Sequence, residues 1–387
     1  MAKLGEIGEI ITGNTPRTSD PKNYESNDIC FIKPSDFSDN DIAELKQSEF
    51  YISEYAKDTA RILPKECILV TCIGIIGKVA INQIPCAFNQ QINALVPLKG
   101  LCDIKYVAYA IQSKQGKMKN IANAAVVPIL NKTQFSNIEI PLPEIEEQKR
   151  ISTLLNKIDW LISLRKQQLT KLDELVKARF VETFGDMLLN SLGWSEKPLE
   201  CLADIVSGIT KGRKTTETDL QEVPYMAVSN VKNGYIDWTT VKTILATRQE
   251  IEQYRLLPDD ILMTEGGDPD KVGRGAIIKN PLENSIHQNH IFRVRLDESE
   301  LLPSFFAEYL QHQKAKRYFL GCAKQTTGIA SINMRQLKSL PVLLPPLSLQ
   351  NEFAAFVERV DQQKQTIQQS LDKLELMKKA LMQDYFG

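Results

Sequence analysis

The fold is decided by residues 141–185, PLPEIEEQKRISTLLNKIDWLISLRKQQLTKLDELVKARFVETFG, because this stretch recurs further along the chain. Residues 343–387, LLPPLSLQNEFAAFVERVDQQKQTIQQSLDKLELMKKALMQDYFG, align with it without a gap. An internal repeat of this kind indicates that one structural unit is used twice. We therefore expect two copies of a globular module, each followed by a long helix. The paired residues include Gln148 with Gln350, Asp159 with Asp361, and Phe184-Gly185 with Phe386-Gly387.

Each of the two stretches predicts one long helix that buries a single face. Apolar residues recur at alternating spacings of three and four, which is typical of a coiled-coil seam. A helix of about 40 residues is roughly 60 Å long. The seam residues are Ile151, Leu155, Ile158, Ile162, Leu169, Leu172 and Val176 in the first helix, and Phe353, Val357, Val360, Ile367, Leu371, Leu374 and Leu381 in the second.

The two helices are expected to pack on each other in opposite directions. Fully burying such side chains stabilises by about 1.5 to 3 kcal/mol each, so two separate exposed helices are implausible. Two copies of one unit tend to pair about a pseudo-twofold axis, and helices across such an axis run antiparallel. This arrangement places Gly387 beside Leu4. Charged residues interrupt the seams at Arg165, Lys364 and Lys378, where they either set the register or face a partner.

Further apolar residues widen both seams beyond what a two-stranded coil needs. Two interpretations remain open: contact with the protein's own globular domains, or a docking site for partner helices. The residues are Leu154, Leu161 and Leu175 in the first helix, and Phe356 and Met377 in the second.

Composition limits the class of protein. The chain has 387 residues, of which 43% are hydrophobic and 25% charged, and this fits two or three globular domains. The longest uncharged run, residues 79–98, contains several Asn and Gln side chains. Their burial in lipid would cost several kcal/mol each, so we reject a membrane span. Residues 1–14 have no apolar signal core, so we expect a cytoplasmic protein.

Charge and metal-ligand patterns are less decisive. Seven cysteines without a CxxC pair favour buried thiols in a reducing cytosol over disulfides or zinc. His287 and His290 form an HxxH pair, but no further ligand pattern accompanies them, and we expect no metal site. The net charge is −1 and the pI is near 6.4. Nucleic-acid binding is not excluded, because it needs a local basic stripe rather than a basic total.

The first copy predicts short strands and two helical segments. Residues 4–16, LGEIGEIITGNTP, predict a short helix or turn that ends at Gly13 and leads into a loop. Runs at 29–33 and 67–76 predict strands. Residues 71–80, TCIGIIGKVA, lack the first Gly and the final Ser or Thr of a phosphate-binding loop, so we interpret them as a strand pair with a glycine bend. Residues 106–120 predict one amphipathic helix.

The second copy repeats these signals in the same order, while its surface residues differ. This is the pattern of one fold that presents two different surfaces. LECLADIVSGITKG, from Leu199, answers residues 4–16 with Gly208 in place of Gly13; GRGAII (273–278) answers GKVAI (77–81), HQNHIF (287–292) answers NQQINA (89–94), and residues 305–319 answer residues 106–120.

Candidate nucleic-acid contacts lie in basic, polar loops and at helix ends. Arg, Lys and Asn side chains suit phosphate and base-edge contacts. The three lysines near the end of the 106–120 helix either complement the helix dipole or meet a phosphate backbone, and both interpretations stay open. The candidates are Arg17, Lys78, Lys114, Lys117, Lys119 and Lys132 in the first copy, and Lys211, Arg213, Lys214, Lys271, Arg274, Lys324, Asn333 and Arg335 in the second.

The duplicated order of globular module, PLP or LPP junction, glutamine, heptad helix and closing Phe-Gly resembles the specificity subunit of type I restriction-modification systems. The resemblance covers essentially the whole chain. It implies an α+β fold in which two pseudo-twofold-related, mixed α/β target-recognition domains are joined by two long antiparallel coiled-coil helices. The domains are then 1–143 and 187–345, and the spacer helices 144–186 and 346–387.

The resemblance also implies what the protein does. Each globular domain would read one half of an asymmetric, split site in double-stranded DNA, and the helices would space the halves and bind two modification (methyltransferase) subunits. Restriction (translocase and nuclease) subunits would complete the complex. S-adenosylmethionine and ATP with Mg²⁺ are then expected only in the partner subunits.

The chain itself is expected to be non-catalytic and to hold no cofactor. It has no Asn-Pro-Pro-Tyr-like methyltransferase motif, no Walker motif and no metal-nuclease set, so an autonomous methyltransferase or nuclease is less well supported. The alternative function is a cytosolic protein-interaction scaffold, built on a coiled coil with ligand-binding domains.

Overall fold

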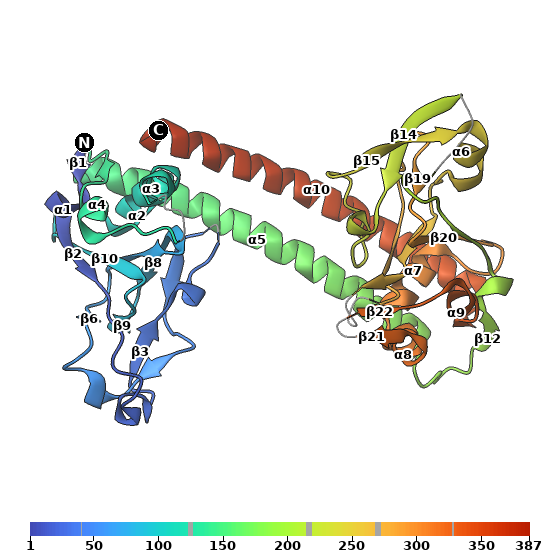
Figure 1. The fold of residues 1–387 in the computed structure, drawn as a ribbon, viewed down its shortest axis with the longest axis horizontal. Helices are drawn as coiled ribbons and strands as arrows, with labels where there is room; N and C mark the ends of the chain where they lie inside the picture. Colours follow the sequence, from blue (N-terminus) through green and yellow to red (C-terminus); the bar gives the residue numbers. More distant parts are fainter. Residues whose placement is uncertain (40, 123–126, 214–218, 268–271, 327–328) are drawn as a thin grey trace. The chain divides into compact units, whose positions relative to one another are not determined.

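The computed structural model describes residues 1–39, 41–122, 127–213, 219–267, 272–326 and 329–387 in two compact units (Figure 1). The first unit comprises Met1–Gln167 with Gln368–Gly387, and the second comprises Gln168–Ile367. Both long helices predicted from the repeat are present, as α5 (Ile145–Phe184) and α10 (Leu347–Phe386). Each of these helices contributes one part to each unit. Among the described residues, no helix is long and apolar enough to cross a membrane.

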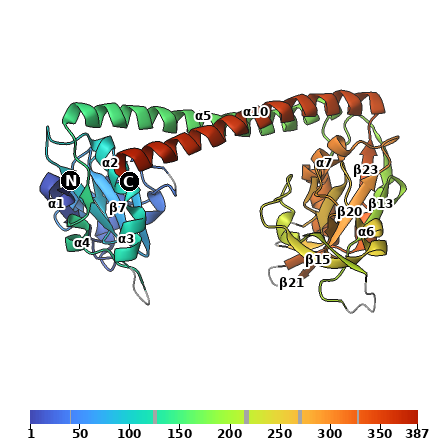
Figure 2. The same ribbon diagram turned by 90° about the horizontal axis from the view of Figure 1, so that it is seen from above.

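The first unit is built on a five-stranded sheet with the order β2-β10-β7-β8-β4 and a four-stranded sheet with the order β5-β3-β9-β6. In Figure 2, helix α2 lies between the larger sheet and the long helices. The elements of the first unit are β1 (Ala2–Lys3), α1 (Leu4–Ile7), β2 (Gly8–Thr12), β3 (Ile29–Ile32), β4 (Ala43–Leu45), β5 (Tyr51–Ile52), β6 (Ile62–Leu63), β7 (Ile68–Ile73), β8 (Ile75–Asn82), β9 (Cys86–Phe88), β10 (Ile92–Pro97), α2 (Ile104–Ser113), α3 (Gln115–Ile121), α4 (Lys132–Ser136) and β11 (Glu139–Ile140), with 3₁₀ turns at Pro21–Tyr24, Pro34–Asp36 and Glu54–Ala56.

The second unit repeats the main sheet as β13-β20-β16-β18 and adds three-stranded sheets β15-β14-β19 and β17-β22-β21. Its elements are β12 (Ser195–Pro198), β13 (Ala203–Ser207), β14 (Leu220–Met226), β15 (Lys242–Thr247), α6 (Arg248–Tyr254), β16 (Ile261–Thr264), β17 (Gly266–Gly267), β18 (Gly275–Ile277), β19 (Ile286–His287), β20 (Ile291–Leu296), α7 (Pro303–Gln311), α8 (Gln313–Cys322), β21 (Lys324–Thr326), β22 (Ile329–Ser331), α9 (Met334–Lys338) and β23 (Pro341–Leu344), with 3₁₀ turns at Leu199–Cys201 and Val228–Asn230.

Two local predictions are wrong. The helix expected at 106–120 is two helices, α2 and α3, which meet at Lys114, and its counterpart in the second copy breaks in the same way at His312. Residues 8–12 form a strand rather than continuing a helix or turn, because Gly8–Thr12 pairs antiparallel with β10 along the sheet edge. The strand pair predicted at 71–80 is confirmed, with its bend at Gly74, whose φ is +73°.

The two sheets show the repeat in detail, with one correction. Thr12 pairs with Asn93 in the first unit, and Ser207 pairs with Phe292 in the second. The structure therefore matches NQQINA (89–94) with residues 288–293, one position later than the HQNHIF segment expected from sequence. His287 takes the place of Phe88, since each pairs with the end of a parallel strand.

The long helices run antiparallel within each unit, and their charged interruptions pair across the seam. In the first unit Lys378 Nζ lies 2.6 Å from Asp159 Oδ1, and Arg165 Nε lies 3.2 Å from Ser370 Oγ. In the second unit Lys364 Nζ lies 2.5 Å from Asp173 Oδ1. These contacts favour the register interpretation of the charged residues. All fourteen predicted seam residues are buried or half-buried.

Each globular core is tied to its own long helix by a buried glutamine. Gln148 accepts a hydrogen bond from the backbone N–H of Asp103 and donates to the carbonyls of Leu101 and Pro143. Gln350 makes the same three bonds in the second unit, with Leu302, Glu300 and Pro345. The two amides are 1% and 0% exposed, so the shared Gln fixes how the helix leaves the domain.

The closing Phe-Gly of each stretch packs into the opposite copy's core. Phe386 belongs to the apolar core of the first unit, which also contains Leu4, so the second helix ends within the first copy's fold. Phe184 lies in the core of the second unit, where its ring centroid is 4.8 Å from that of Phe305. Each globular core is therefore completed by a residue from the other copy's helix.

Candidate nucleic-acid interface

The basic candidates of the first unit fall into two groups. Arg17 is exposed in the loop that follows β2, where its backbone carbonyl accepts hydrogen bonds from Asp20 and Asn23. The other group lies on α3 and α4, where Lys117, Lys119 and Lys132 are exposed. These four side chains are accessible to a nucleic acid and remain predicted contacts.

Two lysines of the first unit already have partners within the fold. Lys114 donates to the backbone carbonyl of Phe386 and so satisfies one of the last carbonyls of α10. Lys78 is 13% exposed and pairs with Asp39, with 2.5 Å between Nζ and Oδ1. Neither interpretation predicted this contact of Lys114 with the end of another helix, and the choice between the two stays open for Lys117 and Lys119.

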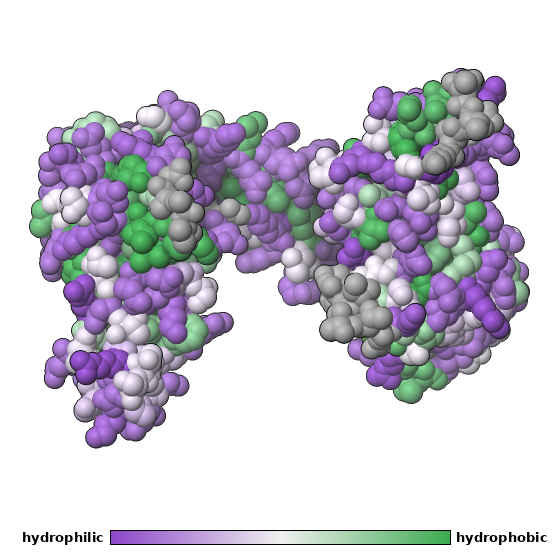
Figure 3. All heavy atoms as spheres, in the orientation of Figure 1, coloured by the Kyte–Doolittle hydropathy of each residue, from purple (hydrophilic) through white to green (hydrophobic). Residues whose placement is uncertain are grey.

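An apolar patch borders the α3 lysines. Ile75, Ile121, Val127 and Ile129 are between 37% and 51% exposed. Backbone contacts hold them together, because Gly74 N–H donates to Pro128 and Ile129 N–H donates to Ala122. Figure 3 shows hydrophobic residues gathered on this side of the first unit.

In the second unit, one group of candidates surrounds the small sheet β17-β22-β21. Lys324 pairs with Ser331 in this sheet, and β22 leads directly into α9. Asn333 begins α9 as its N-cap, with its side chain accepting from Gln336 N–H, and Arg335 is exposed one residue after the helix start. Arg274 is half-buried, and its Nε has no hydrogen-bond partner among the described residues.

The other group lies in the loop after Gly208. Lys211 is exposed, whereas Arg213 forms a two-pronged ion pair with Glu250 of α6 and donates to the carbonyl of Leu245. The hydrogen bonds from Arg213 lower the pKa of the Glu250 carboxyl, so the pair is ionised at neutral pH. Arg213 thus pins its loop to α6, and its availability to DNA is reduced. Lys214 and Lys271 lie outside the described residues.

The two histidines of the HxxH pair make separate contacts. His287 is buried, and its Nδ1 lies 3.2 Å from the carbonyl of Ile291. His290 Nδ1 lies 2.6 Å from Glu265 Oε2 at the surface. No group of three or more His, Cys, Asp or Glu side chains with the arrangement of a metal site occurs among the described residues.

The sequence did not lead us to predict a group of lysine–aromatic contacts between residues 22 and 55 of the first unit. Lys33 Nζ lies 3.3 Å from the ring centroid of Phe50, and Lys22 Nζ lies 5.7 Å from that of Tyr55. Tyr55 is 61% exposed. Aromatic faces combined with basic side chains are suited to nucleic-acid contact. The interleaving of Lys with Phe and Tyr between residues 22 and 55 was the available signal.

Asn14 fixes the loop that carries Arg17. Its side chain donates to the carbonyl of Thr59 at 2.6 Å and accepts from the backbone N–H of Arg61 at 2.8 Å. The guanidinium of Arg61 donates to the carbonyl of Thr12. Arg17 is therefore presented from a loop anchored on both sides, as a recognition loop on a rigid scaffold would be.

The described residues thus form a duplicated mixed α/β module whose two copies are each closed by paired helices and carry different basic loops. The chain belongs to the family of type I restriction-modification DNA specificity proteins, because the model of the type I restriction modification DNA specificity domain matches residues 1–174 and 192–376. It is a DNA-recognition subunit with two target-recognition domains.

Relatives and solved structures agree with this assignment. The chain is 22% identical to the EcoKI specificity subunit of Escherichia coli K12 and 24% identical to the StySPI specificity subunit of Salmonella potsdam, over 96% of this chain and 84% of each relative. In fold it is similar to the S subunit of M. genitalium, with a TM-score of 0.59 at 15% identity over 100% of this chain and 95% of that one. A structure described under complex assembly and conformational transition of the type I R-M system matches with a TM-score of 0.57 at 15% identity, covering 100% of this chain and 96% of that chain.

Proposed function

We propose that the chain reads an asymmetric, bipartite DNA site with one globular domain per half-site, and contributes no catalytic group itself. The proposal rests on one observation: the two copies make the same contacts between domain and helix but expose different loops. Gln148 and Gln350 make the same three hydrogen bonds, whereas the loops after Gly13 and Gly208 differ in their basic residues. Equal scaffolds with unequal loops suit two half-sites of unequal sequence.

The proposal includes a spacing for the half-sites. Two recognition units of one repeated fold typically read half-sites about one DNA turn apart, near 34 Å. Phosphate contacts position such a reader, and side chains on the loops supply the base contacts. Arg17, Lys211 and Arg335 are the exposed basic side chains that we assign to this role first.

The long helices are proposed to dock two modification subunits at equivalent places. Leu175 of α5 and Met377 of α10 occupy matching positions in the repeat, and they are 47% and 52% exposed. In the second unit, Leu175 borders a groove of about 380 Å³ lined also by Ala178, Arg179, Glu182 and Phe356. Two equivalent apolar sites fit two copies of one partner, with restriction subunits joining the complex and the whole acting in the cytoplasm.

DNA binding by the chain together with its modification partner tests the recognition role. The logarithm of the binding constant for a cognate duplex should fall linearly with the logarithm of salt concentration, because phosphate contacts release counterions. Binding that is absent, or independent of salt, would remove the proposal. The scaffold alternative predicts this second result, and family membership does not favour it.

A further inference from the structure

Position 109 of the first copy corresponds to position 308 of the second. Gln148 accepts from the N–H of Asp103 just before α2, and Gln350 accepts from the N–H of Leu302 just before α7. At equal offsets from these fixed points, Tyr109 of α2 matches Glu308 of α7. In the long helices, Asp159 matches Asp361 in the same way. Where the domain meets the long helix, the first copy therefore has a tyrosine and an aspartate, and the second copy has two acidic residues.

In the first unit, Tyr109 clamps α2 to both long helices. Its side chain is 2% exposed, and its hydroxyl lies 2.7 Å from Asp159 Oδ2 and 3.0 Å from Asn156 Oδ1 on α5. Asp159 is in turn paired with Lys378 of α10 at 2.6 Å. Burial and the Asp159 carboxylate raise the pKa of Tyr109, so its hydroxyl remains a hydrogen-bond donor.

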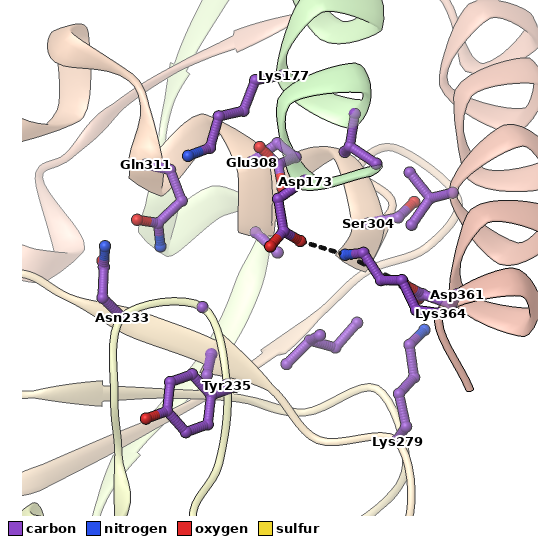
Figure 4. Close-up of a pocket in the computed structure, with 16 residues that line it drawn as sticks. Asp173, Lys177, Asn233, Tyr235, Lys279, Ser304, Glu308, Gln311, Asp361 and Lys364 are labelled. Carbon is purple, nitrogen blue, oxygen red and sulfur yellow. Dashed lines mark ion pairs between the residues drawn. The ribbon is translucent and has the colours of Figure 1, made fainter. Parts of the chain in front are cut away.

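In the second unit, the same place is a cavity of about 400 Å³ rather than a filled contact (Figure 4). Its walls come from α5, α7, α10, β18 and the segment around Tyr235. A water molecule's share of liquid volume is about 30 Å³, so the cavity has room for an aromatic side chain. The Glu308 side chain lines this cavity but forms no hydrogen bond or ion pair with the described residues.

The charges that face Glu308 can pair in more than one way. From α5 these are Asp173 and Lys177, and from α10 they are Asp361 and Lys364. Lys364 Nζ lies 2.5 Å from Asp173 and 3.9 Å from Asp361, so it is shared between two acids. Burial raises the pKa of the Glu308 carboxyl, and it also raises that of Asp361. The Glu308 carboxyl thus faces both acids and lysines, and none of them is fixed as its hydrogen-bond partner among the described residues.

We propose that position 109/308 is a positioning residue that sets how firmly each recognition domain is held on its helix pair. Tyr109 links α2 to α5 and α10 through Asp159. Glu308 makes no such contact with the described residues, so α7 is held on the same helices by its other contacts, such as that of Phe305 with Phe184. The second domain is then held less firmly on its helix pair than the first. The inference concerns the protein alone and does not depend on the proposed half-site reading.

Hydrogen–deuterium exchange on the full chain tests the proposal. The backbone amides of α7 should exchange faster than those of α2. Glu308→Tyr places a donor opposite Asp361 and should slow exchange in α7 on the order of tenfold, as expected for one hydrogen bond to a charged group. Tyr109→Phe keeps the ring but removes the donor, and it should accelerate exchange in α2 by a similar factor. Equal exchange in α2 and α7, or no response to either substitution, would overturn the proposal.

The pH profile separates this role from simple cavity filling. A carboxyl with a raised pKa in the folded state loses its stabilising contribution as pH rises above 4.5, the ordinary value for glutamate. The gain in melting temperature of Glu308→Tyr over the parent chain should therefore widen between pH 4.5 and neutrality. A gain that is the same at every pH would contradict the proposal, because ionisation of Glu308 would then play no part in the joint.

Discussion

The ring of Phe386, from the last turn of α10, packs against the ring of Tyr106 on α2 with 5.2 Å between centroids. Phe386 is 1% exposed, and it completes the core of the first unit from the far end of the sequence. The second copy's helix is thus part of the first copy's fold. The paired helices are structural members of both units rather than connectors between finished domains.

Removal of the Phe386 ring should lower the stability of the first unit. Phe386→Ala is expected to lower the free energy of unfolding by about 3 to 5 kcal/mol, because it leaves a cavity in a closed core. Leu376→Ala, at a position that is 69% exposed on the same helix, is the matched control and should change stability little. Chemical denaturation measures both. Equal effects of the two substitutions would show that Phe386 is not a core residue.

His287 should make the second unit sensitive to acid. Burial, aided by the neighbouring Arg293, lowers the pKa of His287 to about 4, so the folded state holds it neutral. The unfolded chain binds the extra proton first, and stability should fall as pH drops from 6.5 towards 4, by on the order of 3 kcal/mol. Thermal unfolding across this range measures the loss.

The matched variant for this prediction is His287→Phe, which installs the residue found at the corresponding Phe88 of the first unit. It should flatten most of the pH dependence. A smaller slope will remain from His312, whose pKa burial also lowers. An unchanged slope in His287→Phe would show that another group titrates.

Arg335 and Arg213 should behave differently although both were predicted to contact DNA. Arg335→Ala removes an exposed side chain and should weaken recognition of one half-site by about 1 to 3 kcal/mol without changing the melting temperature. Arg213→Ala removes the ion pair with Glu250 and should lower thermal stability as well. Binding to duplexes altered in one half-site at a time separates the effects. Equal loss at both halves in Arg335→Ala would contradict independent domains.

The matching residues Leu175 and Met377 should each hold one modification subunit. Leu175→Glu or Met377→Glu places a charge in an apolar contact, and each should remove one copy of the partner from the complex. The double variant should remove both copies. Lys379→Glu, on another face of α10, serves as the control. Native mass spectrometry counts the subunits, and full occupancy in the double variant would place the docking surface elsewhere.

The long helices were predictable because their seam runs over many turns and recurs at matching positions. The breaks within the shorter helical segments were not predictable. Apolar periodicity continues across Lys114 and His312, so the sequence does not reveal that α2 and α3, or α7 and α8, are separate helices. The short run Gly8–Thr12 fits a helix or a strand equally well, and only its pairing with β10 decides between them.

The candidate interface was predictable only by residue type. Exposed residues such as Arg17 and Lys211 were available from the loop composition, whereas Arg335 lies on α9. The ion pair of Arg213 with Glu250 depends on how α6 packs, which the sequence does not specify. The sequence also does not show that Tyr109 and Glu308 each lie near an aspartate of a long helix, so the difference between them becomes significant only in the structure.

Sequencing the methylated bases of cells that carry this chain with its modification partner tests the central claim most directly. Two different recognition domains on a shared helix pair predict one bipartite, asymmetric motif whose halves are separated by a fixed, unspecified spacer. Substitution of Arg335 should relax only one half of that motif. A contiguous motif, a symmetric one, or no motif dependent on this chain would contradict the account.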